Sequence, residues 1–470
     1  MTELWRRTAI DLAALIARRE ASSAEVVEAH LDRIEAVNTK LNAVVRVLAD
    51  SARSQAAEAD RKVAAGEALG PLHGVPITVK ENIDMAGLPT TQGVRALAEV
   101  VAPVDAPVVE RMRAAGAIPI ARTNLPDFGF RVHTQSDLHG LTRNPWNRAR
   151  TTAGSSGGEA AALASGMSPL GLGNDIGGSL RNPASACGIA SIRPSFGRVP
   201  DAGSTSPADR PMAGQLMAVQ GPMARRVADV RLGLKVIAGA HPRDPWALDI
   251  AFEGLRTPGP IRVAVLEAPP GTPTNPAISA AVRAAADALA RAGYDVRPET
   301  PPDYAEAFDL WSTYLTSDFA EGMDLMATMM GEPGRAFLDY VRRGVAAVQT
   351  PAAMATLYGR RDAIARAWSE WMAERPLLLS PTWTQLPFEN GWDASSFEAA
   401  MATLDLIRPV THANLLGLPS ACVPAGHDRA TNLPIGVLIT GRLMREDLCL
   451  DAAEAIETRI PLTTPIDPAW

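Results

Sequence analysis

Two glycine-rich clusters that contain serine lie in the middle of the chain and could carry acyl-transfer chemistry. They cover residues 152–158 and residues 173–181. Acyl transfer needs backbone amides that converge on the developing oxyanion, and glycine allows the dihedral angles of such a turn. In the second cluster the residues that could supply these amides are Ile176, Gly177, Gly178 and Ser179. The Ser179 hydroxyl would then lie beside the electrophilic carbonyl.

Two other interpretations of these glycines are weaker. Flexible Gly-Ser linkers are common, but this region continues directly into a helical segment at 159–164 and a strand-like segment at 170–173. A phosphate-binding loop needs glycine followed by lysine at a helix start, or GxGxxG between a strand and a helix, and neither context is present. The glycines therefore indicate backbone that approaches something closely inside packed structure.

A serine nucleophile needs a base, which histidine or a desolvated lysine can supply. Lys80 ends an apolar strand-like segment at 75–79. Taken alone, a lysine at the end of a strand is usually solvated and inactive. The histidines have no motif that recommends them as the base, and a surface or core position is the simpler interpretation for each: His30, His73, His133, His139, His241, His412 and His427.

Strands and helices alternate along most of the chain, after an N-terminal helical segment at 1–65 that contains a capping box at Ser22 and Glu25. The expected strands are 75–79, 117–121, 170–173, 261–266, 294–296, 376–380, 418–423 and 435–440. The expected helices after residue 65 are 105–115, 159–164, 277–292 and 446–457. This alternation predicts an α/β fold with a sheet covered by helices on both faces. No linker separates two halves, so we expect one domain over 1–470.

Taken together, these features resemble the amidase signature family. The segments that carry the resemblance are 73–84, 122–124, 142–146, 154–158, 173–181, 221–225 and 414–419. The spacing between Ser155 and Ser179 also matches that family. The resemblance spans nearly the whole chain, with a signature core at 70–230, and is weakest in a variable segment at about 300–375.

The resemblance implies a single large domain with a twisted mixed sheet between helical layers. By position it makes Ser179 the nucleophile, Ser155 a proton relay preceded by a cis peptide bond, and Lys80 the base. It also implies that the oxyanion is bound by the four amides of residues 176–179. The residues implied to support the site are Ser156, Asp175 and Arg181.

This sequence departs from the family pattern near the expected site. Thr152-Ala153 stands where Pro-Gly is usual, Glu81 where aspartate is common, and Asn174 where threonine is common. The three groups implied in proton transfer are unchanged. These departures are therefore expected to adjust the surroundings of Ser155 and leave the reaction type intact.

Composition excludes several classes of function. The chain has 470 residues, a net charge of -7, and no apolar stretch of membrane-spanning length. It offers no basic surface for nucleic acid. Cys187, Cys422 and Cys449 lie far apart, so neither a zinc site nor disulfides are expected, and no metal or cofactor. We expect a cytoplasmic enzyme with a small-molecule amide substrate, and a homodimer as the commonest oligomer.

The predicted function is hydrolysis of a carboxamide C–N bond through a serine acyl-enzyme. One alternative is the glutaminase subunit of a tRNA-dependent amidotransferase, although segment 125–131 does not resemble that subunit. Another is a catalytically inactive binding protein on the same fold. The variable segment carries side chains that could pack into the core or form an apolar pocket, which favours an apolar acyl or aryl amide: Phe308, Trp311, Tyr314, Phe319, Met323, Met326, Met329, Met330 and Phe337.

Overall fold

The computed structural model describes residues 3–205, 209–254, 259–468 and 470. One large mixed sheet of eleven strands organises this part of the chain. In sheet order the strands are β1 (Val44–Val47), β3 (Ile118–Thr123), β2 (Pro76–Lys80), β6 (Leu170–Asp175), β8 (Val219–Ala224), β7 (Ala190–Arg193), β12 (Ser420–Asp428), β13 (Leu433–Gly441), β11 (Leu377–Pro381), β9 (Arg262–Val265) and β10 (Asp295–Pro298). A small separate hairpin pairs β4 (Gln135–Ser136) with β5 (Gly140–Leu141).

The expected strands are all present, with ends that differ by a few residues. The helices that pack around them are α1 (Ala9–Ala17), α2 (Ser23–Leu41), α3 (Ala49–Ala65), α4 (Pro107–Ala114), α5 (Gly157–Ala164), α6 (Arg181–Cys187), α7 (Met212–Met217), α8 (Val227–Ile237), α9 (Pro276–Arg291), α10 (Tyr304–Asp318), α11 (Ala320–Met329), α12 (Glu332–Gly344), α13 (Pro351–Glu374), α14 (Phe397–Leu406), α15 (Arg408–Leu416) and α16 (Glu446–Arg459). The capping box at the start of α2 is formed as predicted.

Alternate residues of each central strand enter different cores, as the two-residue period of a strand requires. On β11, Leu377 and Leu379 pack with α4, α8, α9 and α16, whereas Leu378 packs with α6, α10, α13 and α15. On β13, Val437 and Leu438 divide in the same way. Both faces of the sheet are therefore covered by helices, which confirms the predicted α/β layers.

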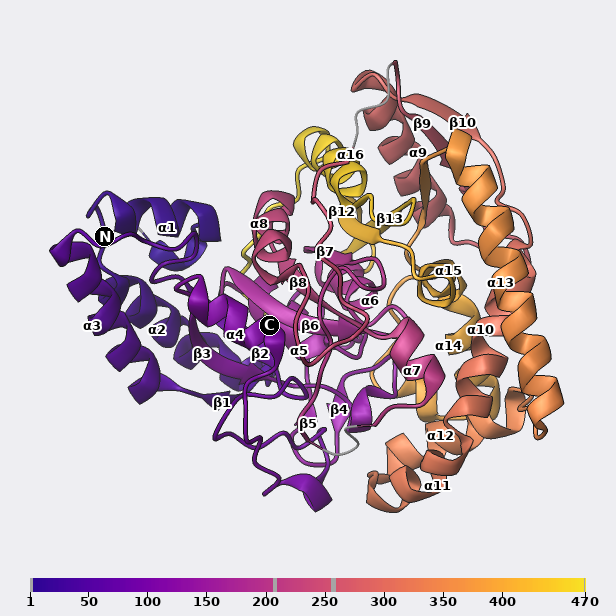
Figure 1. Ribbon diagram of the computed structural model, residues 1–470, viewed down its shortest axis with the longest axis horizontal. Coiled ribbons are helices and arrows are strands. Elements are labelled where there is room, and N and C mark those ends of the chain that lie inside the picture. The colour runs from indigo at the N-terminus through magenta and orange to yellow at the C-terminus, as the bar shows by residue number, and fades with distance from the viewer. Residues whose placement is uncertain (1–2, 206–208, 255–258, 469) are drawn as a thin grey trace.

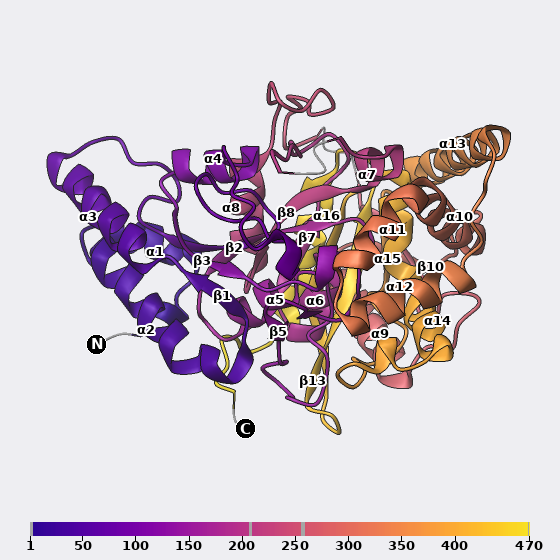
Figure 2. The same cartoon turned by 90° about the horizontal axis from the view of Figure 1, so that it is seen from below.

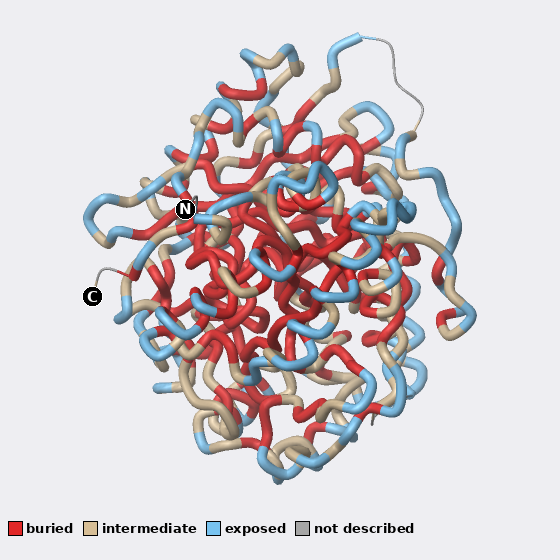
Figure 3. The backbone as a smooth tube through the Cα atoms, turned by 90° about the vertical axis from the view of Figure 1, so that its left-hand side faces the viewer, coloured by how far each residue is buried: buried red, intermediate tan, exposed pale blue. Residues whose placement is uncertain are grey.

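The helices of the variable segment and those of the N-terminus lie at opposite ends of the sheet. Figure 1 and Figure 2 both place α1–α3 at one end and α10–α13 at the other, with the strands between them. The buried backbone is concentrated in the centre and the exposed backbone at the periphery (Figure 3). Within the described ranges, no helix has the length and apolar character needed to cross a membrane.

The sheet brings together the two strands that precede the glycine-rich clusters and Lys80. β2 and β6 are parallel neighbours, with Val79 opposite Leu172. The carboxyl ends of parallel strands face the same edge of a sheet, which is where α/β proteins usually place their ligands. Lys80 at the end of β2 and Asp175 at the end of β6 are therefore held at one edge.

Candidate active site

Lys80 is buried and contacts one of the two predicted catalytic serines. Its Nζ lies 2.7 Å from Oγ of Ser155 and 2.6 Å from Oδ1 of Asn174. Burial lowers the pKa of Lys80 to about 7, although the nearby charges of Asp175 and Glu159 oppose that shift. A large fraction of this amine is therefore unprotonated at neutral pH, which is the form that can accept a proton.

Ser155 lies two residues before the start of helix α5. The peptide bond between Gly154 and Ser155 is cis, as the resemblance predicts. Ser156 is the residue before the first turn of the helix and its hydroxyl lies 3.5 Å from the carbonyl oxygen of Asn174. The amide of Ser156 also donates to the carbonyl of Ser179 at 3.3 Å, so the two glycine-rich clusters meet here.

Asp175 closes the turn that carries Ser179. Its carboxylate accepts hydrogen bonds from the amides of Gly178 and Leu180, at 2.8 and 3.1 Å. The Gly178 amide is thus directed to Asp175 in this structure. Among the described residues, we find no protein acceptor for the amides of Ile176, Gly177 and Ser179.

A buried ion pair fixes Asp175 in turn. Arg181 donates to both carboxylate oxygens at 3.0 Å, and it also donates to Oδ1 of Asn414 and the carbonyl of Val410. Burial alone would raise the pKa of Asp175, but the charge and hydrogen bonds of Arg181 outweigh it and hold that pKa well below its usual range. Asp175 and Arg181 therefore hold the turn of Ser179 through hydrogen bonds and a buried ion pair.

Sequence reasoning missed a clamp formed by Asn182 and Trp383. The side-chain amide of Asn182 donates to the carbonyl of Gly177 at 3.1 Å and lies 3.5 Å from that of Gly154. The indole of Trp383 donates to Oδ1 of Asn182 at 2.9 Å. One side chain thus ties the two glycine-rich clusters together. No local pattern marks this contact, because Trp383 is remote in sequence.

Glu159 is a second group that the sequence did not single out. It is fully buried beneath Lys80, where Thr78 and Thr123 donate to its carboxylate, the latter at 2.7 Å. Gly171 makes room for it, since a Cβ there would overlap the carboxylate. Burial raises the pKa of Glu159 to about 7.

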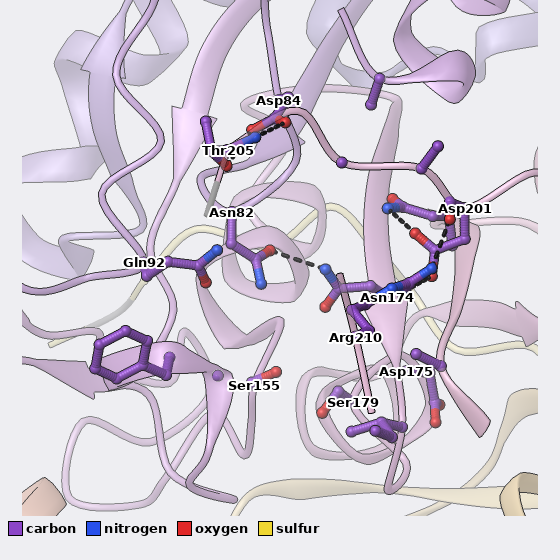
Figure 4. Close-up of a pocket in the computed structure, with 18 residues that line it drawn as sticks. Asn82, Asp84, Gln92, Ser155, Asn174, Asp175, Ser179, Asp201, Thr205 and Arg210 are labelled. Atoms are coloured by element: carbon purple, nitrogen blue, oxygen red, sulfur yellow. Dashed lines mark hydrogen bonds and ion pairs between the residues drawn. The ribbon is translucent and has the colours of Figure 1, made fainter. Parts of the chain in front are cut away.

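Ser179 lies where two cavities meet. One cavity, of about 230 Å³, is polar and is also lined by Ser155 and Asn174 (Figure 4). The other, of about 210 Å³, is mostly apolar and is lined by side chains of the variable segment, namely Trp311, Leu315, Phe319, Met323, Met326 and Phe337. No histidine lines either cavity within the described part of the chain. Lys80 lines neither cavity itself, but it contacts the hydroxyl of Ser155, which lines the polar one.

The apolar cavity confirms one part of the expectation for the variable segment and qualifies another. Five of the aromatic and methionine side chains that the sequence singled out line it: Trp311, Phe319, Met323, Met326 and Phe337. Tyr314, in contrast, is fully buried in the core. The indole of Trp311 also donates to the carbonyl of Ile176 at 3.2 Å, which joins this wall to the turn of Ser179.

Metal ions in proteins are bound by a few kinds of side-chain group. Among the described residues, no group of three or more His, Cys, Asp or Glu side chains is placed to hold a metal ion. The three cysteines are buried and unpaired.

Comparison with known proteins agrees with this geometry. Residues 25–450 match the family described as Amidase. The chain belongs to the amidase signature family. It is 43% identical to an indoleacetamide hydrolase of Bradyrhizobium diazoefficiens, over 97% of this chain and 87% of that protein. It is also 35% identical to a glutamyl-tRNA(Gln) amidotransferase subunit of a Synechococcus species, over 93% of each chain.

The fold of this amidase is shared with solved amide hydrolases. The structure of 6-aminohexanoate cyclic dimer hydrolase matches it with a TM-score of 0.86 at 30% identity, over 98% of both chains. The protein is therefore an enzyme that hydrolyses amide C–N bonds, on a single α/β domain.

Proposed function

We propose that this amidase hydrolyses small carboxamides with an aryl or apolar acyl group through an acyl-enzyme on Ser179. The observation that carries the proposal is that Ser179 lines both the apolar cavity and the polar cavity that is also lined by Ser155, the contact of Lys80. Relatives that include an indoleacetamide hydrolase support an arylacetamide as a substrate.

In the first step, Ser179 Oγ attacks the carbonyl carbon and its proton passes to Ser155, whose own proton passes to Lys80. The oxyanion is bound by the amides of Ile176, Gly177 and Ser179, because the Gly178 amide is taken by Asp175. The C–N bond then breaks as the proton returns through Ser155 to the leaving nitrogen. Water attacks the acyl-enzyme by the same route and releases the acid.

The hydrogen-bonded side chains of Asn174 and Asn82 orient the Lys80 amine. Asn174 Nδ2 donates to Oδ1 of Asn82 at 2.9 Å, so Oδ1 of Asn174 is the atom that faces Lys80. An amide oxygen only accepts, so the neutral amine donates to it. The nitrogen lone pair is left free to accept from Ser155. Asn174 is therefore a positioning residue in this proposal.

The apolar cavity provides no partner for the charged groups of glutamine. Among the described residues that line it, the one cation is Arg131, which is neutralised by a buried bidentate pair with Asp393, at 2.9 and 2.7 Å. This distinguishes the proposal from the amidotransferase glutaminase, despite the relatives of that name. A location in the cytoplasm and a homodimer remain predictions, the first supported by three unpaired cysteines.

The test is turnover of indoleacetamide, phenylacetamide and glutamine by the purified protein, followed by release of ammonia. We expect both aryl amides to be hydrolysed, and glutamine to be a far poorer substrate. Ser179→Ala is the control for contaminating activity. Preferential hydrolysis of glutamine, together with co-purification of partner proteins, would instead favour the amidotransferase glutaminase.

A further inference from the structure

The peptide group between Ile176 and Gly177 is held by a side chain from the variable segment. The indole nitrogen of Trp311, on α10, donates to the Ile176 carbonyl at 3.2 Å. In a trans peptide the carbonyl and the N–H point in opposite directions. The bond therefore fixes the plane of this peptide, and with it the direction of the Gly177 N–H, one of the proposed oxyanion donors.

The ring of the same indole packs against Gly177. A Cβ at position 177 would lie 2.8 Å from Cζ2 of Trp311, which is closer than two such carbons approach in proteins. Trp311 is itself buried, with 5% of its surface exposed. Because glycine has no side chain, the ring reaches the backbone of the turn and leaves this peptide little room to rotate.

The next peptides of the turn are held by Asn182, which is close to them in the chain. The backbone amide of Asn182 donates to the Gly178 carbonyl at 2.6 Å, which orients the Ser179 N–H. Its side chain donates to the Gly177 carbonyl at 3.1 Å. The carbonyl of Ile176 differs, because its donor is 135 positions away in the sequence. One oxyanion donor is thus oriented by a distant helix.

Helix α10 is anchored firmly enough to act as that support. Nε2 of His412, on α15, lies 2.8 Å from the Tyr304 carbonyl, and the two rings stack with their centroids 3.9 Å apart. The guanidinium of Arg408 lies over the ring of Phe308, 3.9 Å from its centroid. Helix α15 also holds Arg181 through the contacts described above. The turn of Ser179 is therefore held between α10 and α15.

We propose that Trp311 is a positioning residue for the oxyanion, whose indole N–H holds the Ile176–Gly177 peptide so that the Gly177 amide points at the substrate oxygen. This role rests on the proposed acyl-enzyme on Ser179. The indole bond also polarises the peptide, which strengthens the Gly177 N–H as a donor. Because the oxyanion develops in the transition state, Trp311 acts on the chemical step more than on substrate binding.

Trp311 also lines the apolar cavity, so a positioning role has to be separated from contact with the acyl group. A wall residue contacts that group equally in the bound substrate and in the transition state. Its loss raises KM and leaves kcat nearly unchanged. Loss of a positioning residue lowers kcat and kcat/KM together.

The experiment compares Trp311→Phe with two control variants. Phenylalanine keeps an aromatic wall and removes the N–H. Trp368→Phe removes another buried indole that donates to a backbone carbonyl, that of Pro302 at 2.8 Å, but lies outside the lining of both cavities. Phe319→Leu changes the wall of the apolar cavity at a side chain that has no hydrogen-bond donor.

The first measurement is steady-state hydrolysis of phenylacetamide. We expect Trp311→Phe to lower kcat by about tenfold or more, because a misdirected oxyanion donor is partly lost, and to leave KM within about twofold of wild type. Trp368→Phe should keep both constants. Phe319→Leu should change mainly KM.

The second measurement is inhibition by phenylacetaldehyde, to whose carbonyl carbon Ser179 Oγ can add. The hydroxyl proton passes through Ser155 to Lys80, and the aldehyde oxygen becomes the oxyanion. The inhibition constant should rise by about tenfold in Trp311→Phe, as the oxyanion loses a directed donor, and remain near the wild-type value in Trp368→Phe.

The outcomes separate this inference from the proposed function. If Trp311→Phe raises KM but keeps wild-type kcat and aldehyde inhibition, Trp311 is a wall residue and the inference is overturned. Equal losses in Trp311→Phe and Trp368→Phe would also overturn it, because they would come from loosening of α10. If Trp311→Phe does not fold, 3-benzothienylalanine at position 311 keeps the ring shape without the N–H and should give the same losses. Hydrolysis that survives Ser179→Ala would overturn the proposed function, and this inference with it.

Discussion

Nζ of Lys80 lies 2.6 Å from Oδ1 of Asn174, one of the residues at which this sequence departs from the family pattern. The threonine hydroxyl can donate or accept, whereas the asparagine oxygen only accepts. The contact thus makes the orientation of the amine depend on Asn82 behind it. Through this contact, Asn174 acts directly on the Lys80 amine.

Asn174→Asp should move the acidic limb of the kcat/KM profile to higher pH. A carboxylate beside Lys80 stabilises the charged amine and raises its pKa, by roughly one unit or more. Asn174→Thr is the comparison variant, because it retains a neutral acceptor and should leave the limb close to its wild-type position. If the acidic limb stays at its wild-type pH in both variants, Asn174 does not position the base.

The pH profile of the wild-type enzyme should report the Lys80 amine. Since burial lowers the pKa of Lys80 to about 7, kcat/KM should rise with pH through about 7 as the amine loses its proton. Lys80→Met should lose most of the activity. Lys62→Met, on the exposed side of α3, should retain both the rate and the limb. A limb that survives Lys80→Met with substantial activity would point to another base.

The covalent intermediate should form on Ser179. A fluorophosphonate should add one group, which peptide mapping locates on that residue. Ser179→Ala should lower kcat by about 10⁴-fold or more, as nucleophile deletions do. Ser155→Ala should cost less, because water can partly replace a relay hydroxyl. An adduct mapped to Ser155 or Ser156 would contradict the assignment.

Arg181→Met should lower the free energy of unfolding more than the loss of a surface arginine does. It leaves the Asp175 carboxylate buried without its cation, which costs about 3–5 kcal/mol in the free energy of unfolding. Arg53→Met is the control, because the Arg53–Glu28 pair is exposed and worth less than about 1 kcal/mol. Denaturant titration of both variants measures the difference. Equal losses would mean that the buried pair does not hold the turn.

Glu159→Gln should change how stability depends on pH. Burial raises the pKa of Glu159 from 4.5 to about 7, so between these pH values the folded state holds a proton that the unfolded state has lost. Its contribution to stability therefore decreases as pH rises through this window. The glutamine variant has no such titration. It should gain up to about 3 kcal/mol relative to wild type between pH 4.5 and 7, measured by denaturant unfolding.

Eight of the eleven strands of the large sheet could be predicted because each leaves a local apolar signal, whereas β1, β7 and β8 were not predicted. Lys80 follows an apolar run, and Ser155 and Ser179 lie in glycine-rich strings whose combination is specific to a family. The α/β class followed from alternation of strands and helices. These signals depend on residues that are close together in the chain.

The parts of the site that escaped prediction depend on contacts between distant residues. Whether the Gly178 amide binds an oxyanion depends on where the Asp175 carboxylate points, which no string reveals. The clamp of Asn182 needs Trp383. The side chains of the variable segment could have packed into the core or lined a pocket. In the structure Tyr314 packs into the core, whereas Met326 lines the apolar cavity.

The attachment of Arg181 to Val410 and Asn414 has a consequence for the order in which activity can arise. A ribosome makes the signature core long before it makes helix α15. Until Asn414 has been added and α15 has docked, Arg181 and Asp175 lack the partners that hold the turn of Ser179. A nascent or truncated chain that ends after the signature core therefore carries all three proton-transfer groups but should release no product.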